Sequence, residues 1–435
     1  MINDNNIRRR TPVKRKRLNV DSDSDVGYNT ENEKRLTDLM SKLPQGSDKM
    51  GFILDKFLSY IPERWQNWVV RGIFTIIMIA LFSFIIHKGP LFLVLLVIII
   101  QFKCFHELIK IGLIVYRLYD LPWFRTLSWY FLLSSNYFFF GEYLIEVFKI
   151  IIQIDKLPSF LVGYHRFVSF CLYCIGFIWF VLSLRKGYYL RQFSLFAWTH
   201  VALMLIVVQS YFIIENILQG LIWFLIPVSM IICCDIMSYV FGFLWGKTPL
   251  IALSPKKTWE GFIGGGISTV IFSIILSSYL MQSHYMICPL EDYLKSPYDC
   301  EIPDEFKPKQ FEISHPYNTI FTFFKIKTIF TYYPFILHSL VISLFASIIG
   351  PFGGFFASGF KRAFKIKDFG DIIPGHGGLM DRFDCQLLIG TFTHVYIMSF
   401  IRTKSIDKLI SEISRLTLED QQKILLHLQD SLTFH

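Results

Sequence analysis

Charged residues are scarce in this chain of 435 residues. Asp, Glu, Lys and Arg make up 18% of it, 53% of the residues are hydrophobic, and the mean hydropathy is +0.45. This composition excludes an ordinary soluble globular protein, which does not sustain repeated runs of about 20 apolar residues. A short apolar segment near the start is also lacking, because the first sixty residues are polar, so we expect no cleavable signal peptide. The sequence predicts an all-α polytopic membrane protein.

Long apolar segments follow the polar start. They cover residues 67–87, 89–116, 127–150, 166–184, 193–214, 218–244, 262–282, 336–357 and 386–402. A membrane-spanning helix needs about 20 apolar residues, so these segments predict about nine transmembrane helices. We expect one multi-pass membrane domain over residues 63–403.

The two ends of the chain are polar. Residues 1–62 carry basic runs at 8–10 and 14–17 and an acidic, serine-containing stretch at 21–25, a composition typical of a disordered tail. The basic runs resemble a nuclear-import signal, but ahead of so many apolar segments a cytosolic flank that contacts anionic lipid is the simpler interpretation. Residues 404–435 have the Ile/Leu spacing of an amphipathic helix.

Lysine and arginine gather in four loops, and they predict the orientation. These residues are Arg117 and Arg125; Arg185, Lys186 and Arg191; Lys247, Lys256 and Lys257; and Lys361, Arg362, Lys365 and Lys367. The positive-inside rule assigns such loops to the cytosol. A count of the crossings does not place every one there, so we expect one re-entrant segment or two adjacent segments that act as one span. The net charge of +9 therefore indicates cytosolic loops and anionic substrates rather than nucleic acid.

Residues 283–335 then form a loop on the luminal side. Its first part is acidic, and it contains Cys288 and Cys300, which could pair in an oxidising lumen. The loops 245–261 and 358–385 are separated by two spans and this luminal loop. They therefore share one face of the membrane and can build one site.

The first of these loops offers basic and hydroxyl groups for phosphates. The stretch 242–248 is not a P-loop, because it is one residue short and follows a membrane helix rather than a strand. Ser254, Lys256 and Lys257 precede a predicted helix N-terminus and suit a polyphosphate. A solvated positive pair is the alternative for the two lysines. Asp235, inside an apolar span, is a candidate metal ligand, with a structural hydrogen bond as the alternative.

The second loop is densely charged and rich in glycine, and we expect its glycines to permit unusual backbone angles and close approach. Charge beside a bilayer is costly, so such a cluster is a functional-site candidate. Its candidate phosphate-binding and catalytic residues are Ser358, Lys361, Arg362, Lys367, His376, Gly377, Gly378 and Arg382. Asp381 and Asp384 lie on one face of a predicted helix start, and two carboxylates together with phosphates suit Mg²⁺. The alternatives are that one carboxylate caps the helix or pairs with Arg382, and that His376 is a packed loop residue.

These residues resemble the signature of a known family. The pattern Ser358-x-x-Lys361-Arg362, Lys367-Asp368, 374–378 (PGHGG) and 381–384 (DRFD) is similar to that of CDP-diacylglycerol synthases, also called phosphatidate cytidylyltransferases. The chain also resembles the eukaryotic branch of this family at residues 104–107, 120–131, 164–167, 196–200 and 253–262. The resemblance as a whole covers roughly residues 60–430.

The resemblance implies an activity and a set of roles. The family transfers CMP from CTP to phosphatidate, giving CDP-diacylglycerol and pyrophosphate with Mg²⁺, and its eukaryotic branch is typically in the endoplasmic reticulum. It implies catalytic roles for Lys361, Arg362, His376 and Asp381, the last as a metal ligand. In the bacterial branch a second metal-binding aspartate lies four residues before the motif serine, where this chain has Gly354. Our hypothesis is that Asp235 replaces it.

The expected partners are CTP, phosphatidate and membrane lipids, with a homodimer as an assembly to test and no nucleic acid. Two other functions stay open. A CTP-dependent polyprenol or dolichol kinase would transfer the γ-phosphoryl group instead. A non-enzymatic lipid-binding scaffold or transporter would explain the spans but not the convergence of Lys, Arg, Gly and two carboxylates. Lys103 and Glu107, four residues apart in a span, are interpreted either as a structural ion pair or as catalytic residues.

Overall fold

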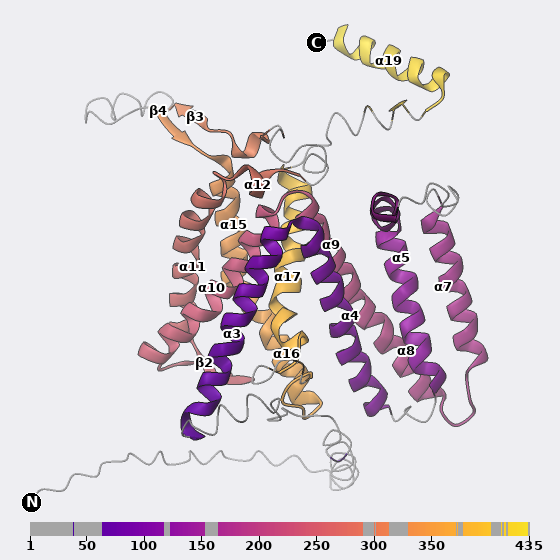
Figure 1. The fold of residues 1–435 in the computed structure, drawn as a ribbon, viewed down its shortest axis with the longest axis vertical. Helices are drawn as coiled ribbons and strands as arrows, with labels where there is room; N and C mark the ends of the chain where they lie inside the picture. Colours follow the sequence, from indigo (N-terminus) through magenta and orange to yellow (C-terminus); the bar gives the residue numbers. More distant parts are fainter. Residues whose placement is uncertain are drawn as a thin grey trace, which may run out of the picture.

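The computed structural model describes residues 63–116, 122–152, 164–289, 302–312, 329–370, 377–401 and 416–433, and the single residues 38, 300, 372, 410, 413 and 414. Long helices run side by side and form its body (Figure 1). They are α3 (Glu63–Lys88), α4 (Pro90–Val115), α5 (Pro122–Ile152), α7 (His165–Leu182), α8 (Tyr189–Leu203), the π-helical η1 (Met204–Val208), α9 (Gln209–Leu218), α10 (Ile222–Trp245), α11 (Trp259–Leu280), α15 (Pro334–Ile348), α16 (Gly350–Ala363), α17 (Met380–Tyr396) and the π-helical η3 (Ile397–Ile401). The predicted all-α membrane class is confirmed.

Six of these helices or continuous helix pairs are long and apolar enough to cross a membrane. They are Pro90–Val115, His165–Leu182, Tyr189–Leu218, Ile222–Trp245, Trp259–Leu280 and Pro334–Ala363. Proline starts two of them, at Pro90 and Pro334, where its missing N–H costs no helical hydrogen bond. The protein is therefore a multi-pass membrane protein, and the count of nine crossings stays a prediction.

The basic loops lie at one end of the bundle. In Figure 1 the turn between α7 and α8, the strand β2 (Ser254–Thr258) and the end of α16 are all at the lower end. With α8–α9 and α15–α16 each taken as one span, successive spans run in opposite directions, so these loops reach the same end by simple alternation. This arrangement does not need the re-entrant or merged segment that we expected. Arg117 lies outside the described residues, between the adjacent ends of α4 and α5.

The opposite end carries the elements between α11 and α15. These are α12 (His284–Ile287), the 3₁₀ helix η2 (Asp304–Phe306) and the antiparallel strands β3 (Lys309–Glu312) and β4 (Ile329–Tyr332) (Figure 1). Cys288 and Cys300, whose pairing the sequence left open, form a disulfide with the two Cα atoms 6.0 Å apart. Because α17 runs from the lower to the upper end, the tail with α19 (Leu418–Thr433) follows on this side.

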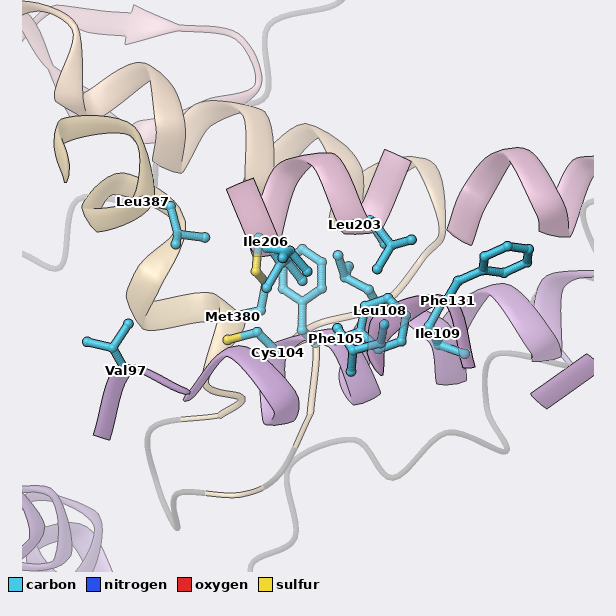
Figure 2. Close-up of a cluster of buried hydrophobic side chains, with 14 of the residues drawn as sticks. Val97, Cys104, Phe105, Leu108, Ile109, Phe131, Leu203, Ile206, Met380 and Leu387 are labelled. Carbon is cyan, nitrogen blue, oxygen red and sulfur yellow. The ribbon is translucent and has the colours of Figure 1, made fainter. Parts of the chain in front are cut away.

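Two buried apolar clusters hold the bundle together. The larger one joins α4, α8, η1 and the start of α17 through residues such as Phe105, Leu203, Ile206 and Met380 (Figure 2). The smaller cluster centres on Trp223 and Phe335, near the end of the bundle that carries β3 and β4. Lipid tails are as apolar as these side chains, so inside a bilayer the clusters stabilise the fold by close packing. The larger cluster fixes α4 against α17, where the signature loop ends.

Small residues let α11 pack closely against its neighbours. Ser273 of α11 faces Ser339 of α15 with their hydroxyl oxygens 3.5 Å apart, and neither side chain is exposed. A Cβ atom on Gly265 would lie 2.1 Å from the Ser238 hydroxyl oxygen of α10. Such small-residue interfaces are typical of membrane helices. They hold α11, which follows the loop 245–261, against α15, which leads into the loop 358–385.

Candidate active site

Glu107 of α4 binds the start of α17. Its Oε1 atom accepts a hydrogen bond from the Leu379 N–H at 3.0 Å, and its Oε2 atom accepts one from the Met380 N–H at 2.9 Å. The side chain is buried. The first N–H groups of a helix have no partner within the helix and carry the positive end of its dipole, so a buried carboxylate is a strong partner for them. Glu107 therefore anchors the signature loop, residues 358–385, to a helix far away in the sequence.

Two glycines let this loop fold closely over Glu107. A Cβ atom on Gly378 would lie 2.6 Å from the Gly370 nitrogen and 2.8 Å from Glu107 Oε2, closer than real Cβ atoms come. Gly377 has a φ of +83°, a backbone conformation that favours glycine. The expected close backbone approach is confirmed for both residues. Their contact with a phosphate stays a prediction, and His376 lies outside the described residues.

Asp381 binds three donors from different parts of the signature loop. Its Oδ1 atom lies 2.7 Å from Lys361 Nζ, and its Oδ2 atom accepts hydrogen bonds from the N–H groups of Phe369 at 2.8 Å and Gly378 at 3.1 Å. The Asp381 side chain is only 5% exposed, and that of Lys361 is 21% exposed. Asp381 thus connects the end of α16 to both halves of the loop. The carboxylate that was expected to bind metal is engaged by a cation and two backbone donors.

Asp384 lies one helical turn after Asp381, and fewer of the described hydrogen bonds end on its carboxylate. Its Oδ1 atom accepts a hydrogen bond from the adjacent Cys385 N–H at 2.8 Å. A Cβ atom on Gly354 of α16 would lie 3.9 Å from its Oδ2 atom. Asp235 of α10 is close enough for its charge to act on Asp384 and on Arg382. A carboxylate of α10 and a carboxylate of α17 therefore lie within electrostatic range of each other, and that of Asp384 lies beside Gly354.

The loop 245–261, here called the hairpin loop, forms a small antiparallel hairpin that the sequence did not predict. It consists of β1 (Pro249–Ile251) and β2 (Ser254–Thr258). The Thr258 hydroxyl accepts a hydrogen bond from the Gly261 N–H at 3.2 Å and so caps α11. Glu260 accepts hydrogen bonds from the Lys247 N–H at 3.1 Å and the Thr248 hydroxyl at 3.0 Å. The hairpin loop is thus fixed by its own residues.

The two loops meet, as the sequence predicted. A Cβ atom on Gly359 of α16 would lie 3.3 Å from Leu253 Cδ2 at the tip of the hairpin. Lys257 Nζ lies 3.9 Å from Asp235 Oδ1, with the side chains 46% and 56% exposed. The protein does not enclose this ion pair, which leaves Lys257 able to exchange Asp235 for another anion. Lys256, Arg362, Lys367 and Arg382 are also exposed, and Ser254 and Ser358 are half-buried.

Residues 69–400 match the model of the cytidylyltransferase family. The chain belongs to this family. It is similar to the phosphatidate cytidylyltransferase of Caenorhabditis elegans, with 60% identity over 95% of this chain and 89% of the relative. Human phosphatidate cytidylyltransferase 1 is 52% identical over 88% of this chain and 83% of the relative, and human phosphatidate cytidylyltransferase 2 is 51% identical over 90% and 87%.

The donor set of this cytidylyltransferase fits a divalent cation. Asp235 and Asp384 supply hard oxygen ligands, the type that Mg²⁺ binds through one or two carboxylates together with substrate phosphates. Asp381 fits less well, because three donors already surround its two oxygens. Asp235 and Asp384 thus fit the role of metal ligand better than Asp381, and the binding of Mg²⁺ stays a prediction.

Sequence reasoning missed the role of Glu107. Lys103 was considered as the ion-pair partner of Glu107, because the two residues are four positions apart on α4. The partners found lie 272 and 273 residues away. The available signal was a carboxylate within an apolar span, inside the stretch 104–107 that resembles the eukaryotic branch.

Proposed function

We propose that this protein transfers CMP from CTP to phosphatidate, forming CDP-diacylglycerol and pyrophosphate. The observation that carries the proposal is the convergence of the hairpin loop and the signature loop on Asp235 and Asp384, at one end of a membrane bundle. The names of the relatives at 51–60% identity support the same reaction. An active site beside apolar helices suits a substrate with a charged head group and lipid tails.

The reaction joins two polyanions, so the site has to offset their repulsion. An oxygen of the phosphatidate phosphate bonds to the α-phosphorus of CTP, and the bond from that phosphorus to the bridging oxygen breaks. Pyrophosphate leaves with the electron pair. A phosphate monoester has a second pKa of about 6, so the nucleophile is already an anion near neutral pH and needs no strong base. Catalysis then depends on position and on positive charge.

The charges of both loops suit this task. Lys256 and Lys257 of the hairpin loop and Arg362 and Lys367 of the signature loop are exposed at the same end of the bundle. Lys361 is held by Asp381, which fixes its ammonium group in place. Mg²⁺ bound by Asp235 and Asp384 would neutralise charge that develops on the CTP phosphates. The basic loops support an active site that faces the cytosol. The endoplasmic-reticulum membrane, which the resemblance to the eukaryotic branch implies, stays a prediction. The homodimer stays a prediction.

The test uses purified protein in detergent micelles with phosphatidate and Mg²⁺, and CTP labelled with ³²P at the α- or the γ-phosphate. We expect label in the lipid fraction from α-labelled CTP and none from γ-labelled CTP. Asp384→Asn should abolish the transfer while the protein stays monodisperse. Label from γ-labelled CTP with a polyprenol acceptor would instead indicate a kinase. The absence of lipid label from folded protein with either nucleotide would refute the enzymatic proposal.

A further inference from the structure

Four basic residues gather where α4 and α5 lie side by side, and no role described above uses them. Lys103, His106 and Lys110 of α4 are three and four residues apart, so they lie on one side of the helix. Arg125, in the first turn of α5, joins them, because its charge and those of the two lysines act on the His106 ring. These four residues are here called the basic cluster.

Two contacts fix α5 against this side of α4. The centres of the His106 and Trp129 rings are 6.0 Å apart. Further from the end of α4, the Gln101 amide donates a hydrogen bond to Asn136 Oδ1 at 3.0 Å, and both side chains are buried. These pairs make the two helices antiparallel, which places Arg125, at the start of α5, beside the last turns of α4. The backbone positions of the basic cluster are therefore set by the packing of two helices.

No acidic side chain balances this charge in the part of the chain that the structure describes. Among those residues, none of the four side chains forms an ion pair or a hydrogen bond. Glu107, four residues after Lys103, uses both of its carboxylate oxygens on the N–H groups of Leu379 and Met380. Like charges three or four residues apart on a helix repel each other, and charges within a membrane span usually pair. The basic cluster is therefore suited to an anion from outside the described chain.

The position of the basic cluster selects the source of that anion. The helix α4 is long and apolar enough to cross a membrane, and Lys103 and Arg125 are exposed on the side of the bundle. At a rise of 1.5 Å per residue, Lys110 lies about 8 Å and Lys103 about 18 Å from the end of α4 at Val115. Lysine side chains at such depth extend toward the lipid head groups. An anion that reaches Lys103 therefore comes from within the bilayer.

Anionic phospholipids meet this requirement, because their tails stay in the bilayer while their phosphate lies at its surface. The basic cluster is in the half of α4 toward the lower end of the bundle, where the other basic loops lie (Figure 1). The positive-inside rule assigns this end to the cytosol. Basic sites between helices on that side of a membrane bind anionic head groups, and arginine can bind two phosphate oxygens at once.

From this arrangement we propose that the basic cluster binds the head group of an anionic phospholipid that the reaction does not consume. The bound phosphate offsets the repulsion on the turns of α4 that carry Glu107, the residue that anchors the signature loop. A ligand that binds only the folded state stabilises it, and each cation near an anionic lipid strengthens the attraction about fivefold. The lipid is neither substrate nor product, so its binding can be measured without CTP.

The test measures thermal unfolding of the full chain in lipid nanodiscs. One set contains phosphatidylcholine alone, and in the other about one fifth of the lipid is phosphatidylserine, a typical anionic lipid of the cytosolic leaflet. The cluster variant carries Lys103→Gln, Lys110→Gln and Arg125→Gln. We expect phosphatidylserine to raise the melting temperature of wild type. Loss of three cations weakens binding at least about tenfold, so this rise should be lost in the cluster variant.

A matched control variant removes the same number of charges at the same end of the bundle. It carries Arg185→Gln, Lys186→Gln and Arg191→Gln, three exposed residues at the turn between α7 and α8. The control variant should keep the rise in melting temperature. Inorganic phosphate added to phosphatidylcholine nanodiscs should give no comparable rise in wild type.

Each outcome supports or overturns the proposal. Loss of the rise in the cluster variant alone supports it. A rise that the cluster variant keeps, an equal loss in both variants, or no rise in wild type overturns it. An equal rise with inorganic phosphate would indicate a site for a soluble anion instead of a lipid.

Single substitutions keep the test valid if the cluster variant does not fold in phosphatidylcholine. Lys110→Gln and Arg125→Gln should then each raise the phosphatidylserine fraction for half of the rise about fivefold, and an unchanged fraction would overturn the proposal. None of these measurements depends on transfer of label from CTP. Failure of the lipid site and failure of the proposed function are therefore distinguishable.

Discussion

The hairpin loop and the signature loop meet at one site but are held by different contacts. The hairpin loop is fixed within itself, by the Thr258 cap and by Glu260, whose partner Thr248 is 12 residues away. The signature loop depends on Glu107, on a helix 272 residues earlier, and on the pair of Lys361 with Asp381. The hairpin lysines are exposed, whereas Asp381 and Glu107 are buried.

This difference predicts what substitutions do. Removal of a support of the signature loop should damage the geometry of the site and the stability of the fold together. Removal of a hairpin lysine should change only the attraction for phosphates. Four experiments test this contrast, and they are given from the largest expected effect to the smallest.

Glu107→Ala should have the largest effect. It leaves the buried N–H groups of Leu379 and Met380 without their acceptor, at about 1–3 kcal/mol each. We expect kcat to fall by about a hundredfold or more and the melting temperature to drop, with Glu107→Gln in between because it keeps one acceptor oxygen. Transfer of label to lipid and thermal unfolding in detergent measure both. Lys103→Gln is the control, and an equal loss there would restore the Lys103 ion-pair interpretation.

Asp381→Asn should destabilise the signature loop, because it leaves Lys361 without its partner. The expected cost is up to about 3 kcal/mol, the low end for a buried pair, since Lys361 is partly exposed. Adding Lys361→Met should restore part of the melting temperature but none of the activity. A double variant that is less stable than Asp381→Asn alone would contradict the structural role of this pair.

Asp235→Asn should weaken the use of Mg²⁺ with little effect on folding. We expect the Mg²⁺ concentration for half-maximal activity to rise at least about tenfold. Loss of a residue that only hydrogen-bonds a metal ligand already lowers metal affinity by about this factor. The Cβ atom of an aspartate at position 354 would lie 3.9 Å from Asp384 Oδ2, so Gly354→Asp should recover part of the activity of Asp235→Asn. No recovery in the double variant counts against Asp235 as the replacement ligand. Titration with Mg²⁺ after chelation gives the measurement.

Lys257→Gln should have the smallest effect. Its ion pair with Asp235 is exposed and contributes about 0–1 kcal/mol, so the melting temperature should not change. We expect KM for CTP to rise about two- to fivefold and to depend less on salt than in wild type. Lys256→Gln, one residue away on β2, should behave alike if the lysines act only as positive charge. A loss of stability in either variant would remove the contrast between the two loops.

Much of this arrangement could be predicted from the sequence. Apolar runs are long enough to identify spans directly, and the positive-inside rule predicts which loops share a face. Gly377 and Gly378 were predicted to allow close approach, and both do. The place of Cys288 and Cys300 in one loop made their pairing possible but did not decide it, and the structure shows the disulfide.

The missed features all depend on contacts between distant parts of the chain. Nothing near Glu107 in the sequence indicates that its partners are Leu379 and Met380. The two carboxylates of the DRFD motif look equivalent in the sequence. Packing separates them, because Asp381 is surrounded by donors whereas Asp384 faces a cavity. The apolar cavity beside Trp198 and Asp384 likewise forms only where α4, α8, η1, α9, α16 and α17 come together.

The contact of Glu107 with the start of α17 also sets an order of events during biosynthesis. A ribosome makes about 5–20 residues per second, so roughly 15 to 50 s separate the synthesis of Glu107 from that of the N–H groups it binds. During this interval α4 carries an acidic side chain in the bilayer ahead of its final partners. A chain that ends before Leu379 therefore leaves this acidic side chain in the bilayer without the two N–H groups that it binds in the folded protein.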